Sequence, residues 1–341
     1  MRYKLHIFLL FLFLSQSLIQ DGFAQDPVYS QFYNAPLQTN AAFAGNSETP
    51  YITSIYRNQW LGLDNAYQTF SASYDQYFSN IKSGFGLSVL TDYSGSGSMR
   101  ATKINGVYSY KLRITRGQYI KGALDVGFAN RRLDWGRYTF YDALDPIYGA
   151  ISPGGSRYPS AEVPPDFDRI QYFDLGTGIL YYTEKFYLGV GFSHINNPKN
   201  SFYKEGTALV TGLEMRISAQ GGFQYNFGDP RRSRYGSKPD FIAPNFLYIN
   251  HGGFQQINVG AAAEVKGLLA GLYYRHSDTN GDAAIASFGV RTGPYKITYS
   301  FDYNISAIAL RGYGSHELSF NFGFIKERPK VDVSDCLELF R

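Results

Sequence analysis

The sequence lacks what several classes of protein need. Its 341 residues include one cysteine, which excludes a disulfide framework and any metal site built from several cysteines. Charged residues make up only 18%, and 32 basic against 28 acidic side chains leave a net charge of +4, too small to indicate nucleic-acid binding. After residue 14, no apolar run approaches the roughly 20 residues that a membrane helix needs.

Tyrosine, phenylalanine and glycine are instead abundant, with 30, 27 and 36 copies respectively. Aromatic residues favour strands, and tyrosine suits membrane interfaces because one end of its ring is apolar and the other is polar. The composition therefore predicts a large β structure, of a kind that is compatible with an outer membrane.

The first 24 residues have the three parts of a secretory signal peptide. Arg2 and Lys4 give a positive start, residues 5–14 are almost wholly apolar, and Gly22-Phe23-Ala24 places small residues before a cleavage point. We therefore expect residues 1–24 to be a signal peptide that is removed on export. An exported chain without a membrane helix is either soluble or a closed barrel, since only helices and closed barrels satisfy every backbone polar group in lipid.

Alternation with a period of two residues recurs along the rest of the chain. Between residues 295 and 305 every odd position is aromatic or apolar, and the even positions carry Lys, Thr, Ser, Asp and Asn. This pattern is typical of strands with one apolar and one polar face. About fourteen such strands are expected, centred near residues 55, 72, 87, 106, 124, 176, 190, 220, 246, 259, 271, 288, 299 and 320. An even number is what a barrel with both ends in the periplasm requires.

The connections between the expected strands favour a barrel over a soluble sandwich. Short turns alternate with long loops nearly all the way round, with a long turn at 228–240 as the exception, and membrane barrels have short periplasmic turns and long external loops. We predict an all-β fold, a single antiparallel transmembrane β-barrel over residues 50–325. Residues 25–49 would lie in the periplasm or plug the lumen, and residues 326–341 would form a periplasmic tail.

Five motifs follow one another in order along the chain: Gln25–Tyr33 with its continuation to Gly45, Tyr56–Trp60, Gly191–Pro198, Tyr299–Ser306 and Gly314–Ser319. Together they resemble the PorP/SprF family of type IX secretion and gliding-motility outer-membrane proteins. The motif residues singled out are Gln31, Phe32, Asn58, Trp60, His194, Pro198, Asp302, His316 and Glu317. Two departures are Ala41-Ala42, where the family usually has proline, and the ending Cys336–Arg341, which differs from the family's common Cys-Pro-Arg-Phe.

The resemblance implies an integral outer-membrane protein without enzymatic activity or cofactor. Members of the family work with type IX secretion components, and some secrete or hold a large surface adhesin, whereas others associate with a periplasmic ring. The expected partners are therefore such components, an adhesin-type cargo and outer-membrane lipid, with no nucleic acid. A channel for a small solute is the alternative function, and an enzyme embedded in the barrel is a weaker one.

The connection from 132 to 169 is the best candidate for binding a partner. From Asp142 to Asp168 it holds five acids, one base and five prolines, and proline lowers the entropy cost of ordering a long loop. A lid over the barrel mouth is the alternative interpretation. The candidate contact residues are Tyr141, Asp142, Asp145, Tyr148, Tyr158, Glu162, Asp166, Phe167 and Asp168.

A second candidate surface is the basic turn 229–238. Its cations would contact an acidic periplasmic protein or the anionic inner leaflet, and the alternative is a solvated turn. The residues concerned are Arg231, Arg232, Arg234 and Lys238.

Catalytic or metal sites have little support in the sequence. The histidines His194, His251, His276 and His316 are scattered, without the spacing of metal ligands. We expect His194 and His316 to be polar residues that bind loops at the external rim. Cys336 is expected to be a free thiol at most.

Overall fold

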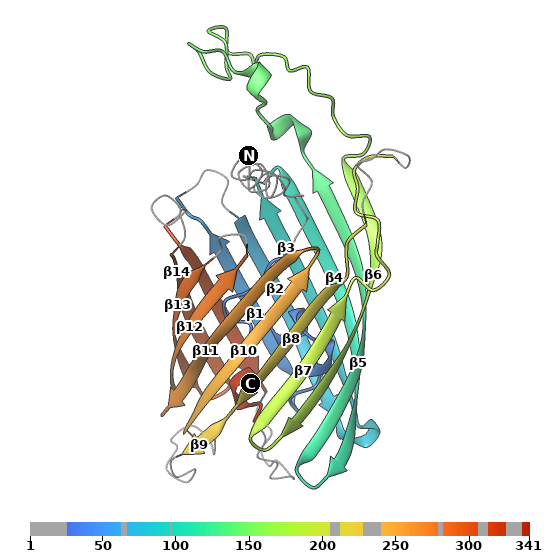
Figure 1. The fold of residues 1–341 in the computed structure, drawn as a ribbon, viewed down its shortest axis with the longest axis vertical. Helices are drawn as coiled ribbons and strands as arrows, with labels where there is room; N and C mark the ends of the chain where they lie inside the picture. The colour runs from blue at the N-terminus through green and yellow to red at the C-terminus, as the bar shows by residue number, and fades with distance from the viewer. Residues whose placement is uncertain are drawn as a thin grey trace, which may run out of the picture.

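A single closed antiparallel sheet forms the protein (Figure 1). The computed structural model describes residues 26–62, 67–95, 97–204, 212–227, 240–278, 282–305, 313–324 and 336–341. Its strands are β1 (Tyr51–Gln59), β2 (Tyr67–Phe78), β3 (Ser83–Ser94), β4 (Met99–Thr115), β5 (Gln118–Leu133), β6 (Arg169–Thr183), β7 (Phe186–Ser193), β8 (Arg216–Phe223), β9 (Tyr225–Phe227), β10 (Asp240–His251), β11 (Phe254–Val265), β12 (Leu268–Ser277), β13 (Ala283–Thr292), β14 (Tyr295–Asn304) and β15 (Ser315–Gly323).

The sheet closes because β1 pairs with β15, the last strand, as well as with β2. The short β9 continues β8, since both pair with β10, so the two form one position in the wall, broken at Gln224. The described strands thus make a closed barrel of fourteen positions. Every expected strand centre lies within one of these strands, so the predicted fold is confirmed. In the part of the chain that is described, no helix combines the length and apolar character needed to cross a membrane.

The barrel has a short-turn end and a long-loop end. Tight turns at 116–117, 184–185, 266–267 and 293–294 define the short-turn end, and the connections 134–168 and 194–215 leave the opposite, long-loop end. That end also carries one tight turn, between β10 and β11, where Gly252 and Gly253 both have positive φ angles of 58° and 80°. Two consecutive positive φ angles are what a two-residue hairpin turn requires, and glycine adopts them without strain.

The strand faces follow the alternation in the sequence. In β14, Lys296 and Ser300 are buried inside the barrel, whereas Tyr295 and Ile297 are exposed on its outer surface. The outer face is apolar because lipid solvates hydrocarbon side chains, and the inner face is free to carry polar groups. The predicted orientation of the aromatic and polar faces is confirmed.

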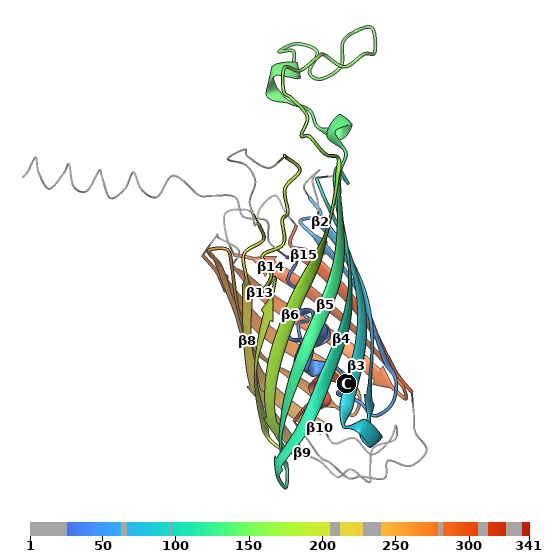
Figure 2. The same ribbon diagram turned by 90° about the vertical axis from the view of Figure 1, so that its right-hand side faces the viewer.

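The lumen is filled by two segments of the chain itself (Figure 2). The first, residues 26–49, enters beside His194 at the long-loop end and leads into β1 at the short-turn end, through the 3-10 turns η2 (Pro36–Gln38) and η3 (Ala41–Phe43). The sequence left two positions open for this segment, the periplasm and the lumen. In the structure it lies in the lumen. Its side chains Phe32, Tyr33 and Phe43 are fully buried.

The second segment is 336–341, with the 3-10 turn η8 (Glu338–Phe340). The prediction of a periplasmic tail is wrong for these residues, because Leu337, Leu339 and Phe340 bury their apolar side chains inside the barrel, against Phe43 and neighbouring groups. Residues 1–25, which include the expected signal peptide, lie outside the described residues. So do Arg231, Arg232, Arg234 and Lys238 of the expected basic turn.

Candidate functional site

Four charged side chains from four wall strands meet where the N-terminal segment crosses the lumen. They are Arg57 on β1, Arg275 on β12, Asp302 on β14 and Glu317 on β15, and we call them the lumenal charge cluster. Each occupies an inward position of its strand, so closure of the barrel directs all four toward the same point.

The cluster is balanced in charge and closely paired. Arg57 lies 3.0 Å from a carboxylate oxygen of Asp302 and 3.0 Å from one of Glu317, and Arg275 lies 2.8 Å from Asp302. All four side chains are buried. Buried charges are costly unless they are paired and hydrogen-bonded, so removing one member would leave an uncompensated charge in the lumen.

This cluster binds the backbone of the N-terminal segment. The Glu317 carboxylate accepts the N–H groups of Ser30 at 2.9 Å and Gln31 at 2.8 Å, and the Ser30 hydroxyl donates to Asp302 at 2.6 Å. Hydrogen bonds to a carboxylate are stronger than neutral ones. The Gln31 side chain also donates to the Glu317 carbonyl at 3.1 Å. The wall charges therefore hold the segment across the barrel.

A second polar group, the histidine cluster, lies where the same segment enters the lumen. His194 places Nδ1 2.9 Å from Asp174 on β6 and Nε2 3.1 Å from Asp26 on the N-terminal segment. Lys103 on β4 pairs with Asp174, and Arg216 on β8 lies 3.5 Å from Asp26. His194 directly follows β7 and has a φ of 59°, a left-handed conformation that few non-glycine residues adopt.

The two carboxylates keep His194 charged. Burial by itself lowers its pKa, but the negative charge of Asp26 and hydrogen bonds to Asp174 and Asp26 outweigh that effect and raise the pKa to about 9. Burial likewise raises the pKa of Asp26, but attraction to His194 holds it well below its usual value. An imidazolium donating through both nitrogens has no lone pair with which to accept a proton, so it does not serve as a general base at neutral pH.

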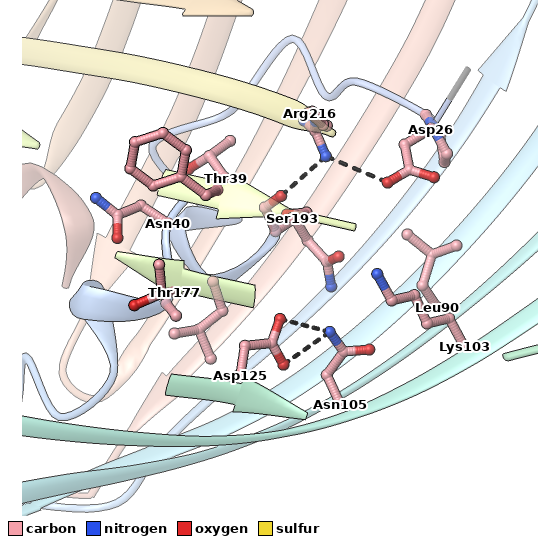
Figure 3. Close-up of a pocket in the computed structure, with 15 residues that line it drawn as sticks. Asp26, Thr39, Asn40, Leu90, Lys103, Asn105, Asp125, Thr177, Ser193 and Arg216 are labelled. Atoms are coloured by element: carbon pink, nitrogen blue, oxygen red, sulfur yellow. Dashed lines mark hydrogen bonds and ion pairs between the residues drawn. The ribbon is translucent and has the colours of Figure 1, made fainter. Parts of the chain in front are cut away.

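A small pocket lies beside the histidine cluster (Figure 3). Asn105 and Asp125 lie side by side in its lining, with the amide of Asn105 donating to both carboxylate oxygens at 3.0 and 2.8 Å. The cavity volume is about 30 Å³, room for about two or three water molecules. Within the described ranges, no three His, Cys, Asp or Glu side chains are grouped so that they can hold a metal ion.

The structure brings several motif residues together. Gln31, Asp302 and Glu317 meet at the lumenal charge cluster, and Phe32 packs edge-on against Tyr273 in the apolar core, with ring centroids 5.8 Å apart. His194 lies at the long-loop end, where its ring turns inward and binds Asp174 and Asp26 instead of a rim loop.

The remaining motif residues lie elsewhere. Trp60 follows β1, and its backbone N–H donates to the Gly314 carbonyl at 2.9 Å. The Pro198 carbonyl accepts the backbone N–H of Leu213 at 2.9 Å. Asn58 lies on β1 next to the inward Arg57, and so belongs to the outer face. His316 shares a 2.7 Å hydrogen bond with Tyr299 of the neighbouring strand, and this strand-to-strand bond replaces the loop contact that we expected.

Of the nine charged residues in these two clusters, the sequence singled out Asp302, Glu317 and His194, and Arg57 and Asp26 lay within the motifs without being singled out. Arg275, Lys103, Asp174 and Arg216 were not singled out, although each is a charged residue at an inward strand position. A search for charges on the polar face of each alternating strand would have found them. It would not have shown which of them meet.

The β5–β6 connection, residues 134–168, extends away from the barrel and does not fold over its mouth (Figures 1 and 2). Two of its expected contact residues shape the loop itself. Asp142 accepts the N–H of Ala161 at 2.6 Å and Asp145 accepts that of Tyr148 at 2.9 Å. These backbone hydrogen bonds lower the pKa of both carboxyl groups.

Other loop residues face solvent or join the loop to its neighbours. Tyr141, Ile147 and Val163 are 93%, 82% and 75% exposed. At the base of the loop, Phe167 donates its N–H to the Phe202 carbonyl at 3.0 Å, and Asp166 accepts the N–H of Lys204 at 2.9 Å. The other expected contact residues in the loop are Tyr148, Tyr158, Glu162 and Asp168, of which Tyr148, Glu162 and Asp168 are exposed.

Comparison with known proteins identifies the barrel. The family model described as "Type IX secretion system membrane protein PorP/SprF" matches residues 21–322. Among solved structures, the Ralstonia pickettii toluene transporter TbuX has a TM-score of 0.50 at 8% identity, over 86% of this chain and 94% of that one. This likeness shows the fold alone.

Two further outer-membrane structures are also similar. The Pseudomonas putida toluene transporter TodX has a TM-score of 0.45 at 10% identity, over 89% of this chain and 98% of that one. The Acinetobacter baumannii outer membrane protein Omp33 has a TM-score of 0.41 at 9% identity, over 82% of this chain and 100% of that one. No curated protein matches the sequence.

Proposed function

Because this chain belongs to the PorP/SprF family of type IX secretion system membrane proteins and folds as an outer-membrane β-barrel, we propose that it anchors a partner surface protein or assists its secretion. The partner would be an adhesin-type cargo of the same secretion system. The barrel itself would serve as a rigid mount in the outer membrane, with its long-loop end on the cell surface, where the longer loops of such barrels lie.

The filled lumen is the observation that carries this proposal. The N-terminal segment crosses the whole barrel and is held by charge-assisted hydrogen bonds at Glu317 and by the contact of Asp26 with His194. The pocket beside it has room for about two or three water molecules. A barrel filled in this way favours the function of an anchor for a partner protein over the alternative, a channel for a small solute.

The β5–β6 loop offers the best surface for the cargo. Tyr141, Ile147 and Val163 present apolar area to solvent, on a loop that Asp142 and Asp145 hold in shape by bonding its backbone. A preformed loop loses little entropy on binding, and exposed aromatic and aliphatic groups supply contact energy. We assign the contact to these apolar side chains and a shaping role to the two aspartates.

Surface proteomics on a deletion strain tests the proposal. Replacing residues 143–162 by a short Gly-Ser linker should remove one large protein from the cell surface and leave the barrel in the outer membrane. A narrower variant is the double change Tyr141→Ser and Ile147→Ser, which keeps the loop and its shaping aspartates and should give the same loss if these apolar side chains make the contact. Normal display of every surface protein in the deletion strain would overturn the proposal.

A further inference from the structure

The segment 336–341, which we call the strap, lies inside the barrel toward its short-turn end (Figure 1). Within the strap, Phe340 donates its N–H to the Leu337 carbonyl at 3.1 Å, which closes the turn η8. Its other described contacts are with the wall or with the N-terminal segment. Contacts with the surrounding barrel therefore determine the position of the strap, as they do for a bound ligand.

An aromatic pocket receives Phe340. Its ring centroid lies 4.7 Å from that of Phe43 on the N-terminal segment and 5.1 Å from that of Tyr187 on β7, which it meets edge-on. Leu337 and Leu339 are also fully buried. Aromatic pairs in such geometries contribute beyond their buried area. A single phenylalanine thus acts as the anchor of the segment.

Polar groups of the wall bind the backbone of the strap, and one side chain of the strap binds the N-terminal segment. The Lys296 ammonium of β14 donates to the Leu339 carbonyl at 3.1 Å, and the Thr183 carbonyl of β6 accepts the Cys336 N–H at 3.3 Å. The Arg341 side chain donates to the Asn46 carbonyl at 2.8 Å. Backbone hydrogen bonds combined with pockets for alternate side chains are a general mode of peptide recognition.

We propose that this part of the lumen is a binding site for a short apolar peptide, and that the strap is its tethered ligand. The ligand class is a peptide with the strap's two leucines and phenylalanine, whose Phe occupies the Phe43–Tyr187 pocket. A tether raises the effective concentration to about the millimolar range, so a modest intrinsic affinity keeps the site closed. A peptide of the same chemistry supplied in trans displaces the strap.

Peptide binding to a truncated barrel tests this proposal. The variant lacking residues 336–341 should bind a fluorescent peptide of the strap sequence saturably, and the full chain should bind it at least tenfold more weakly because its site is occupied. A peptide carrying Phe340→Ala should lose at least tenfold in affinity, as should the truncated barrel carrying Tyr187→Ala. A truncated barrel that migrates as folded but does not bind the peptide, or binds both peptides equally, would overturn the proposal.

A second variant keeps the test valid if the truncated chain does not fold. A protease site placed between residues 324 and 336 allows the strap to be cut after the full chain has folded. Excess strap peptide carrying Cys336→Ser, which has no thiol, should then exchange the cut strap out of the barrel, and the same peptide with Phe340→Ala should not. Cys336 is buried and is the single cysteine of the sequence, so its reaction with maleimide reports the release. Release that is unaffected by added peptide would contradict a specific site.

Discussion

Arg57 on the first strand and Glu317 on the last strand are direct cross-strand partners at the seam that closes the barrel, and their side chains pair at 3.0 Å inside it. The same carboxylate binds two backbone N–H groups of the N-terminal segment. One ion pair therefore links the seam of the wall to the segment that fills the lumen.

Glu317→Ala should release the N-terminal segment while the wall persists. The change leaves Arg57 and the N–H groups of Ser30 and Gln31 without their acceptor, and breaking a buried pair costs about 3–5 kcal/mol. Limited proteolysis of the folded barrel should then cut within residues 26–49. Glu184→Ala, in an exposed turn, is the control and should leave the segment protected. Equal protection in both variants would show that the segment does not depend on Glu317.

Retention of the N-terminal segment should weaken as the pH rises toward 9 and beyond. The pKa of His194 in the folded protein is about 9, above its ordinary value of 6.5, so its contribution is fully present below pH 6.5 and lost as the pH rises through 9. That shift corresponds to about 3 kcal/mol. The charged neighbours are Asp26, Asp174, Lys103 and Arg216.

The His194→Gln variant checks this pH dependence. Glutamine keeps a hydrogen-bonding group but does not titrate, so protease protection of residues 26–49 should fall between pH 6.5 and 9.5 in the parent protein and change much less in the variant. Identical pH profiles would assign the change to other groups.

The intact barrel should show little steady conductance in a planar bilayer. Deleting residues 26–46 removes the longer of the two segments that fill the lumen, and a barrel of this size then has space for an aqueous path. Deleting the loop residues 143–162 is the matched control and should leave conductance low. A parent protein that conducts as well as the lumenal deletion would favour the channel function.

Phe43→Ala should lower stability more than the same change on the outer wall. Phe43 is fully buried between Tyr187 and Phe340, so its loss leaves a cavity costing about 3–5 kcal/mol. Phe85→Ala removes a ring that is exposed on the outer face. The midpoint of heat-induced change in gel migration should therefore fall clearly further for Phe43→Ala, and equal shifts would argue against tight packing in the lumen.

Much of the wall could be predicted because each strand carries its own evidence. In β14 the alternation of Tyr295 and Ile297 with Lys296 is local, and a period of two determines which side chains share a face. The number of strands and the alternation of loop lengths follow from the same local reading. The motifs around Gln31 and Glu317 likewise indicated the family.

The tertiary structure alone decided what these residues do. Arg57 and Asp302 are far apart in the chain and meet only because the sheet closes with one particular register. Residues 26–49 and 336–341 carry no alternation, so no local pattern placed them in the lumen. A strand's faces are determined by neighbours two residues away, whereas a lumenal contact depends on the register of every strand between its partners.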